Sequence, residues 1–485
     1  MPSFEFGLPD SRAAVFHVLT SGARVPLSLP PDLMVSVSGF RGRVGAPLTP
    51  ELVAAVAAAF GVFLRAEGWE GPVCVGRDSR TSGPMLTRAA TAGLQSIGVR
   101  VVELGVVPTP TLLLATRHHG AAGGIAITAS HNPAEWNALK LVTGEGIFLD
   151  AELSRRFQDY LRTEDPPRAG WSGIGEVVED RHAWARHLDA ILALPELDVE
   201  GLGRRGFRVA LDCVHGAGGV VMPDLLARLG CRVSAIGTEP DGLFPRDPEP
   251  TAANLGPLTR LVRESGAELG LAVDPDVDRL ALVDESGKPV GEDLTLALAA
   301  AVVLRRTPGP VVTNLSTSRV VEDVAAAYQS PVVRAPVGEV NVARRMQSER
   351  AVVGGEGNGG VIHPRLHHTR DAPLAAGLVL QHLLDERVTL SAAVSRWPAY
   401  VIVKEKIEFP RDALADAYRV LAEELTPAET DTSDGLRMSW PARRAWLHVR
   451  PSGTEPVVRL IAEAPKAAGA RALLRAALER LAGVA

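Results

Sequence analysis

The chain has 485 residues, well beyond the roughly 100–200 typical of one domain, so we expect three or four domains. Hydrophobic residues make up 46% and charged residues 22%, as in globular proteins with large cores. A net charge of −6 gives no general field for gathering nucleic acid, and three scattered cysteines without CxxC spacing indicate neither a disulfide framework nor a thiolate metal site. The longest apolar run, 294–304, is too short to span a bilayer, and the N-terminus lacks a signal-peptide pattern. We therefore expect a cytoplasmic protein with no membrane or nucleic-acid partner.

Short Val/Ile/Leu-rich runs alternate with longer amphipathic or Ala-rich segments along most of the chain. Such alternation predicts βαβ units with parallel sheets, repeated in three successive domains. The predicted helices are 51–66, 83–96, 216–229, 257–266, 293–305 and 318–328, and the predicted strands are 72–76, 99–105, 207–213, 231–236, 268–273, 311–315 and 331–335.

Three changes of composition mark expected domain boundaries. The stretch TEDPPRAGWSGIG, residues 163–175, is rich in Pro, Gly and charge and predicts a linker. Further boundaries are expected near 290–293 and 397–400. The last segment opens with an alternating strand (YVIVKEKIEF) and closes with an Ala/Leu/Arg-rich helix, which is more typical of an α+β domain. We place the four domains at 1–170, 171–291, 292–396 and 397–485.

Ser130 lies in the hexapeptide TASHNP, which directly follows the apolar run GGIAI. A strand that ends in small polar residues and Asn-Pro presents a tight, exposed turn. His131 is adjacent and Lys140 follows nearby, and a serine hydroxyl becomes a good nucleophile only with such a base, a cation or a metal. Taken alone, the motif is either a nucleophile loop or an ordinary polar turn.

Three carboxylates follow the apolar run ELGLAV at alternate positions: Asp274, Asp276 and Asp278. Like charges at this spacing raise one another's pKa unless a cation joins them, and Mg²⁺ suits oxygen ligands beside a phosphate. An EF-hand is excluded because its sixth position holds Arg279 in place of glycine, and because LALV continues as a strand. The alternative is a solvated acidic loop.

The glycine-rich segment GGEGNGG, residues 354–360, formally satisfies GxGxxG. No helix is expected after it, because VIHPRLHH follows, so we reject a dinucleotide site. A flexible loop that exposes Glu356 and Asn358 would suit sugar hydroxyls, while a plain loop is the alternative.

The segment RPSGTEP, residues 450–456, combines an arginine, two hydroxyls and a glycine. Guanidinium, hydroxyl and backbone N–H donors together favour an anion site, and the alternative is a capped turn.

With these motifs in family order, the chain resembles the α-D-phosphohexomutase superfamily along nearly its whole length. TASHNP resembles the phosphoserine loop, DPDVDR the metal loop, GEGNGG the sugar loop and RPSGTEP the phosphate loop. The resemblance implies an α/β fold of four domains around a central cleft. Three of them would be α/β domains with mixed or parallel sheets, and the last a smaller α+β domain. Supporting matches are SGFRG from Ser38, GRDSR from Gly76, VPTP from Val107 and PEP from Pro248.

The resemblance implies an isomerase that moves phosphate between the 1- and 6-positions of a hexose through a 1,6-bisphosphate. Ser130 would carry the phosphoryl group, and its oxygen would hold Mg²⁺ with Asp274, Asp276 and Asp278. Glucose 1,6-bisphosphate, or the cognate bisphosphosugar, would act as activator. The remaining implied site residues are Arg41, Lys140, Arg279 and His131 at the transfer site, Glu356 and Asn358 on the sugar, and Arg450, Ser452, Gly453 and Thr454 on the phosphate that is not transferred.

Two histidines common among bacterial relatives are absent from this chain. Gly360 and Glu339 occupy those positions, and this pattern is similar to the archaeal-type branch. The sequence therefore leaves open which group performs the acid–base chemistry. His363, His367 and His368 are candidates, with a solvated histidine cluster as the alternative. Ala138 stands where glycine is common, and it would cost stability if that position required a positive φ.

The preferred hexose is the least determined prediction. The GEGNGG loop favours glucosamine phosphate, and mannose or glucose phosphate keeps the same mechanism. A catalytically silent sugar-phosphate-binding protein and a phosphatase are alternatives of another class. We expect a phosphosugar as the small-molecule partner, and a monomer or homodimer.

Overall fold

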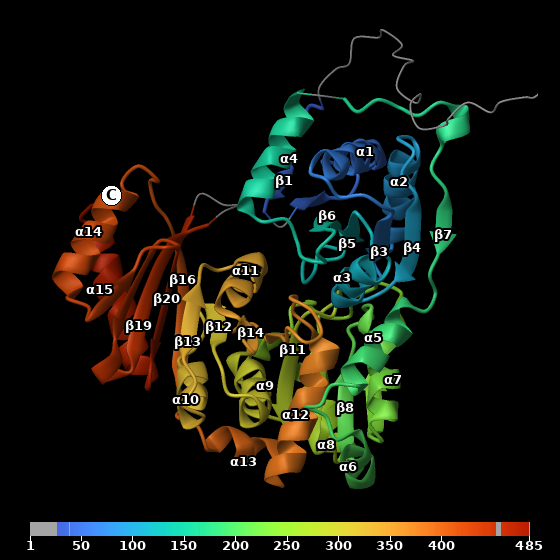
Figure 1. Cartoon of the computed structure of the whole chain (residues 1–485). Coiled ribbons are helices and arrows are strands. Elements are labelled where there is room, and N and C mark those ends of the chain that lie inside the picture. Colours follow the sequence, from blue (N-terminus) through green and yellow to red (C-terminus); the bar gives the residue numbers. More distant parts are fainter. Residues whose placement is uncertain (1–26, 38, 164, 453–456, 485) are drawn as a thin grey trace, which may run out of the picture.

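The computed structural model describes residues 27–37, 39–163, 165–452 and 457–484. Four separate sheets follow one another along the chain, and the domains that they form are arranged in a curve (Figure 1). The first sheet, in blue and teal, and the C-terminal sheet, in red, are the two ends of this curve. Within the described residues, no helix is both long and apolar enough to cross a membrane. The predicted four-domain α/β fold is confirmed.

The first sheet has seven strands in the order β1-β2-β6-β5-β3-β4-β7 and mixes parallel with antiparallel pairs. Helix α1 begins where Thr49 accepts a hydrogen bond from the Leu52 amide (3.3 Å), with Pro50 in the first turn. Its Ala, Phe and Leu side chains are buried against α2, as the predicted helices 51–66 and 83–96 require. The elements are β1 Met34–Ser36, β2 Gly39–Arg43, α1 Pro50–Ala66, β3 Val73–Arg77, α2 Gly83–Gln95, β4 Val101–Val106, α3 Thr109–His118, β5 Gly123–Ile127, β6 Trp136–Thr143, α4 Ala151–Thr163 and β7 Val177–Glu179.

Strand β7 lies beyond residue 170, where we place the end of the first domain, yet it pairs in parallel with β4. The other strands fall within the predicted domain ranges. Ala138 lies in β6, and its φ is not among the positive values, so its methyl group imposes no strain there. The condition for a cost at this position is therefore not met, because an extended strand accepts alanine.

The second sheet has the order β11-β10-β8-β9 and positions the acidic motif. Strand β10 (LGLAV) is buried throughout because it lies between two neighbours and under helices. The acidic residues follow directly at its carboxyl end, and β11 returns antiparallel. The elements are α5 Ala183–Leu192, α6 Val199–Arg205, β8 Arg208–Asp212, α7 Gly218–Arg228, β9 Arg232–Ile236, α8 Gly256–Ser265, β10 Leu269–Val273 and β11 Leu280–Asp284.

The third sheet has the order β13-β12-β14-β15, and one continuous hydrophobic core joins it to the second sheet. Its hairpin β14–β15 contains the glycine-rich segment. Helix α12 begins at Asp371, whose side chain accepts from the Leu374 amide (3.0 Å). The elements are α9 Asp293–Arg306, β12 Val311–Asn314, α10 Val320–Ala327, β13 Val332–Ala335, α11 Glu339–Glu349, β14 Val353–Glu356, β15 Gly360–Ile362, α12 Ala372–Glu386 and α13 Leu390–Ser395.

The fourth sheet is antiparallel, with the order β16-β20-β19-β18-β17, and it has a core of its own. Helices α14 and α15 pack against each other, and α15 also packs against β16 and β20, as expected for an α+β domain. The elements are β16 Val401–Glu408, α14 Leu414–Leu425, β17 Glu429–Asp431, β18 Leu436–Trp440, β19 Ala445–Pro451, β20 Val457–Ala464 and α15 Ala467–Leu481.

Candidate active site

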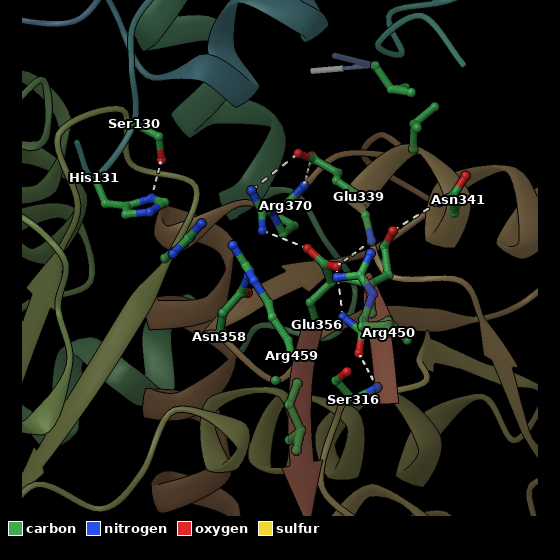
Figure 2. A pocket seen from close by; sticks show the side chains of 18 of the residues that line it. Ser130, His131, Ser316, Glu339, Asn341, Glu356, Asn358, Arg370, Arg450 and Arg459 are labelled. Atoms are coloured by element: carbon green, nitrogen blue, oxygen red, sulfur yellow. Dashed lines mark hydrogen bonds and ion pairs between the residues drawn. The ribbon is translucent and has the colours of Figure 1, made fainter. Parts of the chain in front are cut away.

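A cavity of about 880 Å³ is lined by residues from all four domains (Figure 2). The first domain contributes Ser130 and Lys140, and the second contributes Arg279. Glu356 comes from the third domain and Arg450 from the fourth. The tertiary structure thus brings the four predicted loops to one cavity.

Ser130 follows β5 and has a φ of 52°, in the left-handed region that non-glycine residues rarely adopt. Its amide donates to Thr128 Oγ1 (2.9 Å), and the Thr128 hydroxyl donates to Asp78 Oδ2 (2.7 Å). Neighbouring contacts thus hold this unfavourable backbone in place, as is common at functional sites.

Arg80 holds the serine loop from inside the protein and is fully buried. Its guanidinium donates to the carbonyls of Ser130 (2.7 Å) and Asn132 (2.6 Å), and also to those of Pro133 and Trp136. The Nε atom pairs with Asp78 at 3.0 Å. The sequence marked GRDSR only as a supporting motif, and the structure shows that it organises the serine loop.

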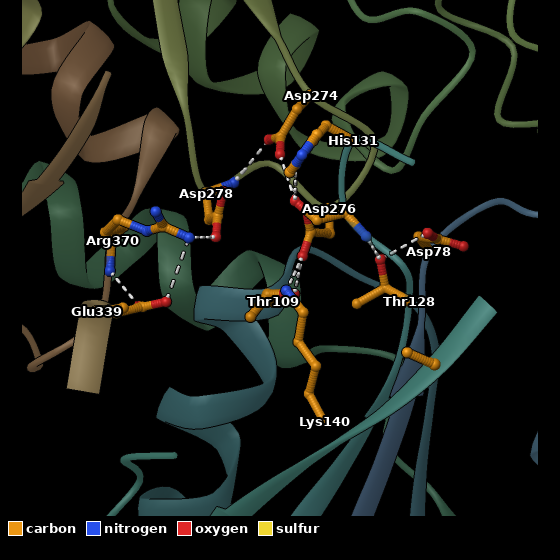
Figure 3. A network of polar contacts seen from close by, with 12 residues as sticks. Asp78, Thr109, Thr128, His131, Lys140, Asp274, Asp276, Asp278, Glu339 and Arg370 are labelled. Carbon is orange, nitrogen blue, oxygen red and sulfur yellow. Dashed lines mark hydrogen bonds and ion pairs between the residues drawn. The ribbon is translucent and has the colours of Figure 1, made fainter. Parts of the chain in front are cut away.

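The serine hydroxyl lies against the acidic motif, because Ser130 Oγ donates to Asp274 Oδ2 at 2.9 Å. One carboxylate oxygen from each of Asp274, Asp276 and Asp278 lies within 4.8 Å of the others, and all three residues are buried (Figure 3). Val277, in the turn between them, has a φ of 63°, so this backbone is also held in the left-handed region. The predicted serine and acidic triad therefore meet.

The three carboxylates have different electrostatic surroundings. Burial and the charges of Asp278 and Asp276 raise the pKa of Asp274 well above its ordinary value. Burial acts in the same direction on Asp276, but the ammonium of Lys140, at 2.7 Å from Oδ2, holds its pKa below the ordinary range. Thr109 also donates to Asp276 Oδ2 (2.9 Å).

Two oxygens of the triad have unused acceptor capacity. Asp276 Oδ1 and Asp278 Oδ1 are buried and accept no hydrogen bond from any described residue. Buried oxygens without a donor are costly, and a hard divalent cation with oxygen ligands would satisfy them. The donor set therefore fits Mg²⁺.

The remaining predicted transfer-site residues lie around Ser130. Arg41 donates to Asn132 Oδ1 at 2.7 Å, and burial lowers the pKa of its guanidinium. His131 Nδ1 lies 3.4 Å from Ser130 Oγ. Burial, with the nearby cations Arg279 and Arg41, lowers the pKa of His131 to about 2, so this imidazole is neutral at pH 7.

The glycine-rich segment is a tight hairpin, and Glu356 is the last residue of β14 with 3% of its surface exposed. Its Oε1 accepts from Asn314 (2.8 Å) and the Gly338 amide (3.1 Å). Burial alone would raise the pKa of Glu356, but Arg370, whose Nη1 donates to Oε2 at 2.7 Å, holds this pKa below the ordinary value. The segment is thus less exposed than expected, although Glu356 and Asn358 both line the cavity.

The phosphate segment lies partly outside the described residues, which exclude Gly453 and Thr454. Arg450 lines the cavity and pairs with Asp434 at 2.9 Å. Ser452 is buried, and its amide donates to the Val457 carbonyl (2.8 Å). Of the described part of the predicted cradle, Arg450 therefore lines the same cavity as Ser130, and Ser452 is not among the residues that line it.

Sequence reasoning missed several cavity residues, because their motifs carry no recognisable pattern. Three of these residues are cations on two neighbouring strands, where alternate side chains share a face. They are Lys404 and Lys406 of β16 and Arg459 of β20. The alternation of VIVKEKIE was the available signal, but by itself it predicts only a strand.

The three candidate histidines are neither solvated together nor among the residues that line the cavity. His363 and His367 are buried, and His367 donates to Asp371 Oδ2 (2.8 Å). Only His368 is partly exposed. Both expectations are wrong for His363 and His367, because these two imidazoles pack inward against the buried carboxylates of Glu196 and Asp371.

Family models match almost the whole described chain. They are "Phosphoglucomutase/phosphomannomutase, alpha/beta/alpha domain I" over 33–168, domain II over 185–287 and domain III over 291–400, and the corresponding C-terminal domain over 400–480.

Named relatives and a solved structure agree with these matches. A protein of Methanopyrus kandleri named "Probable phosphoglucosamine mutase" is 39% identical over 90% of this chain and 95% of its own. A "Phosphoglucomutase/phosphomannomutase" of Thermococcus kodakarensis is 37% identical over 91% and 97%. The crystal structure of a phosphoglucomutase/phosphomannomutase family protein from Burkholderia thailandensis has a TM-score of 0.79 and 28% identity, over 92% of this chain and 98% of that chain. This chain therefore belongs to the phosphoglucomutase/phosphomannomutase family of the α-D-phosphohexomutase superfamily, whose members are isomerases.

Proposed function

We propose that the protein interconverts glucosamine 6-phosphate and glucosamine 1-phosphate through phosphorylated Ser130 and a 1,6-bisphosphate. The observation that carries the mechanism is the 2.9 Å contact between Ser130 Oγ and Asp274 within the buried acidic triad. A phosphoryl group on this oxygen would lie beside the cation site and beside Lys140 and Arg41. Phosphoryl transfer depends mainly on such positioning and charge neutralisation.

In the first half-reaction, the bond between Ser130 Oγ and phosphorus breaks while a substrate hydroxyl oxygen bonds to phosphorus. The hydroxyl proton leaves the sugar, and the serine oxygen gains a proton when the free hydroxyl re-forms. Lys140, Arg41 and Arg279 balance the charge of the transferred group. The bisphosphate then turns over, and its other phosphate returns to Ser130.

The metal in this proposal is Mg²⁺, held by Asp274, Asp276, Asp278 and the Ser130 oxygen. Its chemistry when bound is to neutralise charge on the transferred phosphoryl group. The support is the pair of buried, unsatisfied oxygens on Asp276 and Asp278.

At the other end of the cavity, Arg450, Ser452, Gly453 and Thr454 would grip the phosphate that is not transferred. Arg and hydroxyl donors suit a phosphate that must be held in either orientation of the sugar. Glu356 and Asn358 would accept and donate hydrogen bonds to ring hydroxyls.

Glucosamine phosphate is proposed because the sugar loop reads GEGNGG and because relatives at 34–39% identity carry the name phosphoglucosamine mutase. The second candidate is a phosphomannomutase/phosphoglucomutase, which the Thermococcus relative at 37% identity favours.

The test is ³¹P NMR of the purified protein with Mg²⁺ and a trace of glucose 1,6-bisphosphate. Glucosamine 6-phosphate, mannose 1-phosphate and glucose 1-phosphate are followed in parallel, with Ser130→Ala as the control. We expect interconversion that is fastest for glucosamine phosphate and absent in the variant. Faster turnover of mannose or glucose phosphate would select the second candidate. If no sugar is isomerised while phosphoserine is present by mass, the mutase proposal is wrong, and free phosphate would then identify a phosphatase.

A further inference from the structure

The side chain of Arg370 fills the space beside Gly360 in the sugar hairpin. A Cβ added to Gly360 would lie 2.7 Å from Arg370 Cγ and closer still to its Cδ. Contacts this short do not occur between real side chains, so a side chain at position 360 and Arg370 cannot both keep their places. The glycine is therefore explained by the arginine, which lies ten residues further along the chain.

The guanidinium of Arg370 joins three carboxylates from separate parts of the chain (Figures 2 and 3). One nitrogen, Nη1, donates to Glu356 Oε2 at 2.7 Å. The other, Nη2, donates to Asp278 Oδ2 and lies 3.4 Å from Glu339 Oε2. A planar guanidinium presents its donors in a fixed fork, so these two bonds fix the positions of Glu356 and Asp278 relative to each other.

Glu339 and the backbone hold Arg370 in this position. The Arg370 amide donates to Glu339 Oε1 at 2.8 Å, and the Thr369 hydroxyl donates to the same oxygen. Arg370 has only 7% of its surface exposed. The arginine is therefore fixed before any ligand enters the cavity.

We propose that Arg370 is a positioning residue that couples the cation site to the sugar site. One end of its fork orients Asp278 for the cation, and the other orients Glu356 for a sugar hydroxyl. The inference rests on the proposed function, because it takes these two carboxylates as the cation and sugar ligands. Removal of a group that orients a metal ligand typically weakens metal binding by about 10–100-fold.

Two variants test the coupling by different routes. Arg370→Lys keeps one positive charge but cannot bridge two carboxylates with a planar fork. Gly360→Ala leaves the arginine unchanged but forces it away from the hairpin. The matched control is Gly203→Ala, because a Cβ at this exposed helical position has no atom within 4 Å.

The measurements are Mn²⁺ affinity by electron paramagnetic resonance, and KM and kcat for glucosamine 6-phosphate. We expect each variant to weaken Mn²⁺ binding and to raise KM, each by about 10-fold or more, while Gly203→Ala changes neither. The double variant should be no worse than the more impaired single variant, because both changes remove the same contact.

The proposal is overturned if Arg370→Lys changes only the melting temperature. It is also overturned if this variant changes only one of the two quantities, the Mn²⁺ affinity or KM, and leaves the other at its wild-type value. If the wild type does not turn over, the proposed mutase function fails by itself. Calorimetric binding of glucosamine 6-phosphate then replaces KM, and a parallel loss of sugar and Mn²⁺ affinity in the variant still supports the coupling.

Discussion

Among the residues that the structure describes, two buried clusters place potential metal ligands within 4.8 Å of one another. One is the triad of Asp274, Asp276 and Asp278, and the other joins His187, His367 and Asp371. By residue type, two histidines and an aspartate resemble a zinc site more closely than three aspartates do. Their hydrogen bonds indicate instead that the three aspartates fit a metal ion and that the histidine cluster does not.

In the histidine cluster, each described donor has an acceptor. The two Nε2 atoms of His187 and His367 lie 2.7 and 2.8 Å from Asp371 Oδ2. The Thr369 amide donates to His367 Nδ1 at 3.2 Å, so the proton of this neutral imidazole is on Nε2. No lone pair on Nε2 is then available for a metal. Thr111 completes the set through His187 Nδ1 (2.8 Å).

The triad differs because some of its oxygens have no donor. Two of them accept no hydrogen bond from the described residues, and burial together with the charges of Asp278 and Asp276 raises the pKa of Asp274. Proximity of ligand-type side chains therefore does not identify a metal site. Unsatisfied buried acceptors are the additional feature that distinguishes the triad, and a hard cation with oxygen ligands would remove their cost. The satisfied cluster serves instead to join α3, α5 and the start of α12.

The largest expected effect comes from Asp274→Asn, which keeps the shape of the side chain and removes one charge from the triad. We expect kcat to fall about 10³-fold, because the cation that neutralises the phosphoryl group is lost. The metal-free variant should be more stable by about 1 kcal/mol, since repulsion within the triad falls. A coupled assay and urea unfolding in EDTA measure the two effects. If Asp274→Asn keeps the wild-type Mn²⁺ affinity, the triad is not the metal site, and the distinction drawn between the two clusters is wrong.

Asp371→Asn is the matched change in the other cluster. It weakens the shared acceptor for two buried imidazoles, and loss of hydrogen bonds to a charged group costs about 1.5–3 kcal/mol of unfolding free energy. Urea unfolding measures this loss, and Mn²⁺ titration should give the wild-type affinity. Loss of Mn²⁺ binding together with retained stability would mean that this cluster is the metal site.

Acid should destabilise the histidine cluster. Burial lowers the pKa of His367, although Asp371 opposes the shift, so its folded pKa lies below the unfolded value of about 6.5. Between these two values the unfolded chain binds more protons, and the free energy of unfolding therefore falls as the pH is lowered below about 6.5. His367→Gln, which keeps a donor toward Asp371, should flatten this slope between pH 7 and 5 in urea unfolding. An unchanged slope would contradict the assignment.

The smallest expected effect concerns backbone strain, which distinguishes the serine loop beside the triad from a regular strand. At Ser130, glycine should be more stable than alanine by about 1 kcal/mol, because neither has the hydroxyl and only glycine accepts the positive φ without strain. In strand β6 the sign should reverse, so that Ala138→Gly destabilises by about 0.5–1 kcal/mol. Thermal unfolding compares the variants. Equal stability of Ser130→Gly and Ser130→Ala would mean that the loop carries no strain.

The sequence by itself predicted the features that depend on consecutive residues. TASHNP, DPDVDR and GEGNGG are contiguous, so neighbouring residues alone place each loop at the end of a strand and indicate its chemistry. The alternation of apolar and amphipathic runs likewise predicted α/β layers, because burial on both faces requires continuous apolar strands.

The tertiary structure decided the features that depend on residues distant in the chain. The pairing of Arg370 with Asp278, and that of His187 with Asp371, span two domains each, and no local pattern links the two partners of either pair. Arg80 appeared in the sequence only as part of a supporting motif, although it holds four carbonyls of the serine loop. Local sequence specifies strands, turns and motif loops because these follow from neighbouring residues. Which carboxylates remain unsatisfied depends on how the separate domains pack, and this packing separates the candidate cation site from an equally dense but satisfied cluster.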